Sequence, residues 1–165
     1  MAKEFSFDVV SQVDMQEVDN AFQQAARELA QRYDLKGTGA ALEFDRKAAA
    51  FVVSAPSEFV AQQVADVLAG KLAKRGVDLG ALRWGACVPA AGSSVRRTGT
   101  LVQGIEQDVA KRIAKDLRAQ KIKAKATVEK EKLRVSSASK DALQSAISYL
   151  KEQDYGQPLQ YVNYR

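Results

Sequence analysis

Residues 53–57 read Val-Ser-Ala-Pro-Ser, and residues 135–139 read Val-Ser-Ser-Ala-Ser, 82 residues later in the chain. Each stretch follows a short run of alternating apolar residues and precedes a run with helical spacing, so each is a strand-to-helix junction. Ser57 and Ser139 are residue types that cap helix N-termini. Because the same junction occurs twice with similar letters, an internal duplication is the economical explanation.

The predicted elements on both sides of these junctions follow one order. Alternation at residues 5–10 predicts a strand, and Asp14 with Glu17 three residues later begins a helix that ends near Tyr33. A break at residues 36–39 precedes the next strands. The remaining elements of the first half are strands 40–45 and 49–54, a helix from Ser57 to about residue 75, and a strand at 82–88.

The second half repeats this order after a short loop at residues 92–94. Its elements are a strand at 98–103, a helix at 105–117, a hairpin of 123–128 with 133–136, a helix at 139–150 and a strand at 159–164. We therefore predict an α+β protein with two ferredoxin-like βαββαβ domains, residues 1–92 and 93–165, each with an antiparallel sheet. Two helices would cover one sheet face and leave the other free to bind.

Composition excludes several classes of function. The 165 residues are 46% hydrophobic with charges of both signs, which is enough for a packed core. No stretch approaches the roughly 20 apolar residues of a membrane span, and Glu4 and Asp8 stand where a secretory leader would be apolar. The single cysteine, Cys87, cannot form an internal disulfide. We expect a cytoplasmic protein with no membrane partner.

The chain contains no histidine, the side chain most often used for proton transfer and for binding transition metals. It also has no phosphate-binding loop of the G-x-x-x-x-G-K-[ST] type and no G-x-G-x-x-G. Lysine, tyrosine or paired carboxylates could still catalyse, but no motif gathers them. We expect no enzymatic activity, no cofactor and no metal.

The net charge of +5 is concentrated in one segment. Residues 95–134 contain 12 Lys+Arg and 5 Asp+Glu, whereas residues 1–94 contain 10 and 12. Such clustering is expected for an anionic partner, since cations that neutralise phosphates release counterions. A cluster of this size can equally serve to solubilise a helix.

The side-chain period of two in the second hairpin separates charged from apolar residues. Lys123 and Lys125 point away from Ala124 and Ala126, and Lys132 and Arg134 point away from Leu133 and Val135. If the helices cover the apolar side, the four cations share the free face, which would suit phosphates.

Single-stranded nucleic acid also needs flat side chains for base stacking. The candidates are aromatic residues on predicted strands, Phe7 and Tyr161 foremost, with Phe5, Tyr164 and Trp84 as others. An aromatic residue on a strand can equally belong to the core, and the signature of the RNA-recognition motif is missing. Arg96 and Arg97 follow the loop at 92–94 and could reach a ligand between the two halves.

The chain resembles the bacterial YajQ family at both ends and in the middle. The segments that carry the resemblance are Phe5-Ser-Phe-Asp-Val-Val-Ser-Gln-Val-Asp14, Lys71-Leu-Ala-Lys-Arg-Gly76, Leu101-Val-Gln-Gly-Ile105 and Gly156-Gln-Pro-Leu-Gln-Tyr-Val-Asn-Tyr-Arg165. The resemblance implies exchanged first strands, with 5–10 in the second sheet and 96–103 in the first. It also implies a nucleotide ligand, with RNA, GTP and cyclic di-GMP as candidates.

Two segments depart from the family pattern. Val102 stands where the family has a lysine, and residues 79–93, including Trp84 and Cys87, are atypical.

From the basic face, the absence of catalytic motifs and the resemblance, we expect a non-enzymatic nucleotide- or RNA-binding protein. The alternatives are an adaptor that regulates a transcription or translation protein, and a nucleotide hydrolase.

Overall fold

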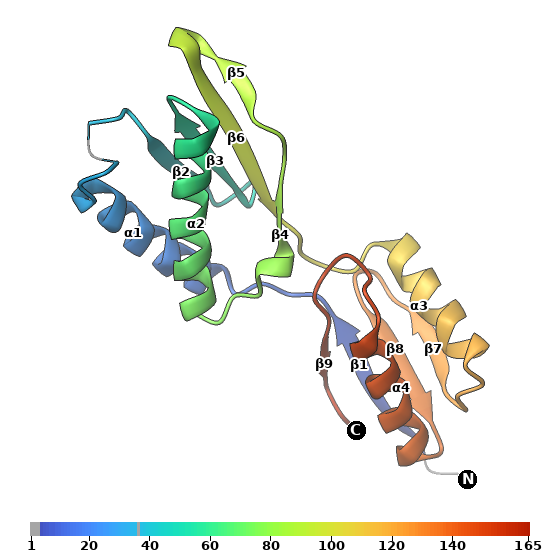
Figure 1. Cartoon of the computed structure of the whole chain (residues 1–165). Coiled ribbons are helices and arrows are strands. Elements are labelled where there is room, and N and C mark those ends of the chain that lie inside the picture. Colours follow the sequence, from blue (N-terminus) through green and yellow to red (C-terminus); the bar gives the residue numbers. More distant parts are fainter. Residues whose placement is uncertain (1–3, 36) are drawn as a thin grey trace. The chain divides into compact units, whose positions relative to one another are not determined.

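The structure, a computed structural model, describes residues 4–35 and 37–165, so residue 36 of the predicted break lies outside the described residues. The chain divides into two compact units. One comprises residues 13–102 and is called the central unit here, and the other combines residues 1–12 with 103–165 and is called the terminal unit. Each unit is α+β, with two helices on an antiparallel sheet (Figure 1).

The central unit contains a sheet in the order β2-β3-β6-β4, with β5 paired to β6. Its helices α1 and α2 lie on the same face of this sheet (Figure 1). Its elements are α1 (Met15–Gln31), β2 (Ala41–Asp45), β3 (Ala50–Ala55), α2 (Glu58–Lys74), β4 (Leu82–Trp84), β5 (Val88–Ala90) and β6 (Ser94–Leu101).

Local capping explains where these helices begin. The Asp14 side chain accepts hydrogen bonds from the backbone N–H groups of Gln16 and Glu17, and Ser57 accepts from that of Val60. Both residues satisfy donors that would otherwise have no partner in the first turn. The buried stripes of the two helices then pack on Phe51, which is fully buried. The predicted helix starts are thereby confirmed.

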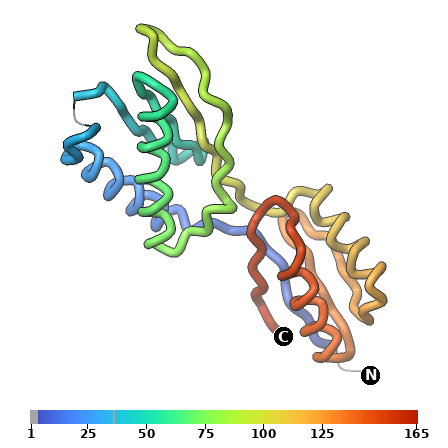
Figure 2. Tube along the Cα trace, viewed as in Figure 1, coloured from blue at the N-terminus to red at the C-terminus, as the bar shows by residue number. Residues whose placement is uncertain are grey.

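The terminal unit has a sheet in the order β7-β8-β1-β9. Figure 2 shows the blue N-terminal strand running among segments from the orange and red end of the chain. Its elements are β1 (Phe5–Val10), α3 (Gln107–Ala119), β7 (Lys125–Val128), β8 (Leu133–Ser137), α4 (Lys140–Glu152) and β9 (Gln160–Val162). Ser139 caps α4 by accepting from the N–H of Ala142, as predicted.

The core of the terminal unit lies between its helices and one face of its sheet. The strands contribute Phe7, Val9, Leu133 and Val135, and the helices contribute chiefly Ile113, Leu117, Leu143, Ile147 and Leu150. These residues leave the opposite sheet face without a covering helix of this unit (Figure 1). We call this uncovered side of the β7-β8-β1-β9 sheet the open face.

The segment between the two predicted repeats differs from the prediction. The strand expected at 82–88 is two short strands, β4 and β5, and the strand expected at 98–103 already begins at Ser94. Ala90 pairs with Ser94, so residues 91–93 connect two strands of one sheet, and the loop predicted at 92–94 lies within the central unit. Gly92 and Ser93 have φ of 70° and 61°, the left-handed conformation that such a tight connection uses.

Within the described ranges, the helices are too short or too polar to cross a lipid bilayer.

Candidate functional site

Strand register determines which side chains occupy the open face. Arg134 of β8 lies opposite Asp8 of β1 on one side and Thr127 of β7 on the other. Lys125 lies opposite Ser136, two residues from Arg134 along β8 and therefore on the same face. Of the four cations predicted from alternation, Lys125 and Arg134 lie within β7 and β8, and these two share the side away from the helices.

Asp8 is the centre of this face, although it is an acid and only 2% exposed. Arg134 Nε lies 3.2 Å from Asp8 Oδ1, and Lys132 Nζ lies 3.5 Å from Oδ2. Asn163 Nδ2 donates a third contact to Oδ2 at 2.8 Å. Burial alone would raise the pKa of Asp8, but the hydrogen bonds from Asn163 and Arg134 and the two positive charges outweigh it and lower the pKa.

A second carboxylate faces the same two cations. Glu129 lies 3.4 Å from Lys132 Nζ and 3.9 Å from Arg134 Nη1. Lys132 and Arg134 therefore already have two acidic partners, and their charge is largely compensated before any ligand arrives. Their first role is to hold the buried Asp8.

Lys123 and Lys125 differ from that pair because both are exposed, and neither has an ion pair with any described residue. Lys125 is the first residue of β7, an outer strand of the sheet. Lys123 precedes the strand, and its backbone carbonyl accepts a hydrogen bond of 2.6 Å from Ser137 Oγ. Lys123 and Lys125 therefore place uncompensated positive charge at the β7 edge.

Phe7 and Tyr161 do not belong to the open face, and this corrects the prediction that they bind a base there. Phe7 is fully buried in the core, and its ring centroid lies 6.0 Å from that of Tyr161. Tyr161 lies opposite Val9, which also faces the helices, and Lys151 of α4 lies 5.9 Å from its ring. Burial raises the pKa of Tyr161. Both rings pack between sheet and helices, where no base could reach Phe7.

Arg96 and Arg97, which the sequence predicted to reach a ligand between the two halves, lie on opposite sides of β6 in the central unit. Arg97 donates to Gly85 O at 2.9 Å and to Gln62 Oε1 at 3.0 Å. Its guanidinium also lies 5.1 Å from the Trp84 ring, which is partly buried. Arg97 is thus engaged in its own unit, whereas Arg96 is exposed on the side opposite the helices, across from Ser54.

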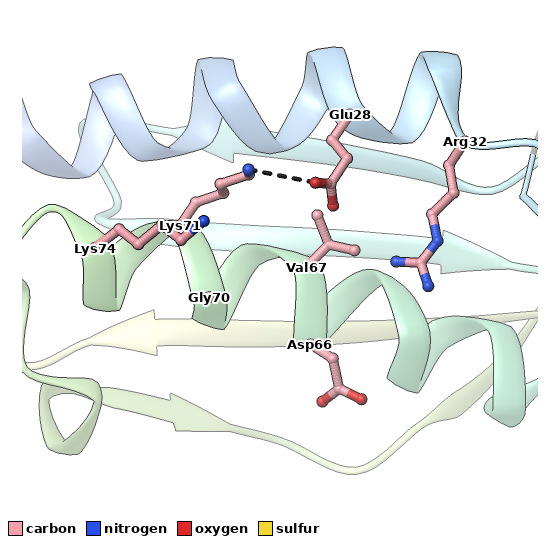
Figure 3. A pocket seen from close by; sticks show the side chains of 7 residues that line it. All are labelled: Glu28, Arg32, Asp66, Val67, Gly70, Lys71 and Lys74. Atoms are coloured by element: carbon pink, nitrogen blue, oxygen red, sulfur yellow. Dashed lines mark ion pairs between the residues drawn. The ribbon is translucent and has the colours of Figure 1, made fainter.

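A different charged pocket lies between α1 and α2, with a volume of about 240 Å³ (Figure 3). Lys71 from α2 reaches toward Glu28 from α1, and their charged atoms are 3.3 Å apart. Asp66 places a second carboxylate at the pocket. Because acids accompany the cations, this pocket has little preference for an anion.

Comparison with known sequences now adds to this geometry. A profile of the family described as "Nucleotide-binding protein YajQ-like" matches residues 5–165. The chain belongs to this YajQ-like family. A protein of Chloroherpeton thalassium named "Nucleotide-binding protein" is 44% identical over 165 residues and covers all of both chains. One of the same name from Desulforamulus reducens is 46% identical over 165 residues, which is 100% of this chain and 99% of the relative.

Membership of the YajQ-like family supports nucleotide binding, and the described residues of this chain contain no cluster of three or more metal-ligating side chains. Asp8 and Glu129 are the residues of the open face that the sequence analysis missed. The alternation of residues 5–10 could have placed Asp8 away from the core. Its cationic neighbours, however, depend on pairing between strands more than a hundred residues apart.

Proposed function

We propose that this YajQ-like protein binds a nucleotide or RNA without performing chemistry, through phosphate contacts at the β7 edge of the open face. Lys123 and Lys125 would provide the main charges, with Lys132 and Arg134 as neighbours. The observation that carries the proposal is a pair of exposed lysines that make no ion pair with any residue the structure describes, in a family of nucleotide-binding proteins. RNA, GTP and cyclic di-GMP are the ligands we propose to compare.

The chemistry of the open face favours contacts to phosphate over contacts to bases. The strand residues that share this side with Arg134 are polar or aliphatic, and none of them is aromatic: Ser6, Asp8, Val10, Lys125, Thr127, Ser136, Gln160 and Val162. A surface without rings cannot stack bases, so its affinity would depend on charge and fall steeply with added salt.

The test is a pair of charge reversals, Lys123→Glu with Lys125→Glu. Both side chains are exposed and unpaired, so their replacement does not disturb Asp8, as replacement of Arg134 would. We expect weaker binding of a single-stranded RNA, and a salt slope reduced by about 1 to 1.5, since each phosphate contact contributes about 0.7. The measurement is fluorescence anisotropy at two or more salt concentrations.

The matched control reverses Lys111 and Lys115, which are exposed on α3 in the same unit and change the formal charge equally. A loss of affinity that is equal in both double variants would mean that only overall charge matters, and the proposed site would be wrong. Release of phosphate from GTP in the presence of magnesium would contradict the absence of chemistry.

A second candidate function, an adaptor for another protein, is favoured by one observation in the central unit. β2 is an edge strand, and a pocket of about 510 Å³ beside it is lined by α1 and the segment before β2. Its lining is apolar or glycine: Ala26, Leu29, Ala30, Leu35, Gly37, Gly39, Ala40, Ala41 and Leu42. An extended peptide could add to β2 and fill this pocket. Such a contact would hardly respond to salt, unlike the binding of RNA.

We also propose that the two units derive from one duplicated ferredoxin-like unit with exchanged first strands. In support, β1 pairs with β8 and β9, and β6 pairs with β3 and β4. Each sheet thus takes one strand from beyond its own predicted repeat. The similar junctions at residues 53–57 and 135–139 are the matching evidence in the sequence.

A further inference from the structure

A pocket of about 400 Å³ opens in the terminal unit between the start of β1, the start of α4 and the segment after β9. Its lining is Phe5, Ser6, Lys140, Leu143, Gln144, Tyr164 and Arg165. The volume lies within the roughly 300–1,000 Å³ of small-molecule sites. The lining side chains combine aromatic rings, cations, an amide and a hydroxyl, and none of them is acidic.

Tyr164 is the exposed ring of this pocket, with 61% of its surface accessible. One side of it rests on Phe7, with ring centroids 6.0 Å apart and planes inclined by 34°. Exposure of that extent is unusual for a ring that is supported by the core, and it leaves surface available for a planar ligand.

The residues on either side of Tyr164 hold it in place. Asn163 has φ of 57°, the left-handed conformation that asparagine tolerates, and its side chain donates to Asp8 Oδ2 at 2.8 Å. Arg165 exchanges two backbone hydrogen bonds with Ser6, of 3.0 and 3.3 Å. The backbone on both sides of Tyr164 is thus held before any ligand binds, which reduces the entropy lost on binding.

The cations of the pocket stand close to its rings. Lys140 Nζ lies 4.9 Å from the centre of the Phe5 ring and makes no ion pair with any described residue. The Arg165 side chain brings a second positive charge. By comparison, the α1–α2 pocket contains two carboxylates, and the pocket beside β2 contains no charged residue among those that line it.

We propose that this pocket binds one nucleotide, with its base against Tyr164 and its phosphate at Lys140 and Arg165. The inference rests on the proposed function in one respect, that the ligand is a nucleotide. It assigns the base to a site separate from the lysines at the β7 edge. The two surfaces share Asp8, which holds Asn163 beside the pocket and Arg134 on the open face.

The experiment titrates the full-length, ¹⁵N-labelled protein with GMP, AMP, guanosine and inorganic phosphate. Amide shifts give the site, and calorimetry gives the affinity. We expect GMP or AMP to shift the amides of Phe5, Ser6, Gln144 and Arg165. Guanosine and phosphate should each bind at least ten-fold more weakly, because each carries only half of the recognised groups.

Three variants separate the roles of ring and charge. Tyr164→Ala should weaken nucleotide binding about ten-fold, whereas Tyr164→Phe should retain it. Lys140→Glu should weaken the binding of GMP about ten-fold and leave that of guanosine within two-fold. The control is Lys151→Glu, in the last turn of the same helix and outside the pocket lining, which should change neither.

The pocket would be the wrong site if GMP shifted only amides near Lys123 and Lys125, or if Tyr164→Ala bound GMP as tightly as the native protein. RNA binding that falls with the β7-edge variants but not with the pocket variants would overturn this inference and leave the proposed function standing. The reverse pattern would support the pocket and overturn the proposed phosphate site at the β7 edge. If a short oligonucleotide displaces GMP and shifts the same amides, the nucleotide that the pocket binds is the terminal nucleotide of a nucleic-acid strand.

Discussion

Arg134 of β8 and Asp8 of β1 lie directly opposite each other in the terminal unit, with Arg134 Nε 3.2 Å from Asp8 Oδ1 across a sequence separation of 126 residues. The carboxylate is almost inaccessible to solvent, whereas the Arg134 side chain is 38% exposed. A buried acid is therefore neutralised by cations that remain partly in water. This arrangement places a structural ion cluster on the face that carries the proposed ligand site.

Replacement of the buried acid should destabilise the protein. We expect Asp8→Asn to lower the free energy of unfolding by roughly 1 to 3 kcal/mol at neutral pH, the usual effect of removing a charged hydrogen-bond partner. Urea unfolding followed by circular dichroism measures it. Glu43→Gln, at an exposed position of β2, is the control and should have almost no effect.

The contribution of Asp8 should also depend on pH in a defined direction. Its pKa is lowered in the folded state from the ordinary value of 3.8, so its stabilisation is complete above that value and is lost as the pH falls through the folded pKa. The difference in stability between the native protein and Asp8→Asn should therefore shrink in acid. A difference that stayed constant from neutral pH to about pH 2 would refute this assignment.

Removal of the second carboxylate should strengthen the binding of anions. Glu129 competes for Lys132 and Arg134, so Glu129→Gln should raise the affinity for RNA or nucleotide about two- to five-fold at low salt, as expected for one partly exposed charge. The measurement is the same anisotropy titration. Glu152→Gln, exposed on α4, removes an equal charge elsewhere in the unit and should have a smaller effect.

Phe7 should contribute to stability and should not contact RNA bound at the β7 edge. Phe7→Leu should lower the free energy of unfolding by roughly 1 to 3 kcal/mol, because the smaller side chain leaves space in the core. RNA affinity, measured where the variant is fully folded, should match that of the native protein. A large loss of affinity without loss of stability would show that Phe7 belongs to the binding site.

In the central unit, adding even a methyl side chain at Gly99 should lower the stability of the protein. A Cβ atom there would lie 2.8 Å from Cε3 and Cζ3 of the Trp84 ring, so Gly99→Ala must displace the indole and should cost about 1 to 3 kcal/mol. Trp84 is the single tryptophan, and its fluorescence reports the displacement. Gly85→Ala is the control, since its Cβ would meet only Thr98 O, at an ordinary 3.5 Å.

The sequence by itself determined the secondary structure and, for much of it, which side chains face the core. The caps at Asp14, Ser57 and Ser139 marked three helix starts, and alternation along the second hairpin separated Lys125 and Arg134 from the core. These features are local, because capping and side-chain period depend on residues a few positions apart. The same periodicity predicted one strand where the structure has β4 and β5, because side-chain alternation does not reveal the irregular backbone between them.

Only the tertiary structure decided which strands are neighbours, and hence what surrounds each charge. Alternation assigned Lys132 and Arg134 to a common face, but it could not reveal that the buried Asp8 lies between them and Asn163. Nor could it distinguish Phe7, fully buried, from Tyr164, largely exposed. Strand pairing depends on hydrogen bonds and packing between segments more than a hundred residues apart. No local pattern in the chain encodes such distant contacts.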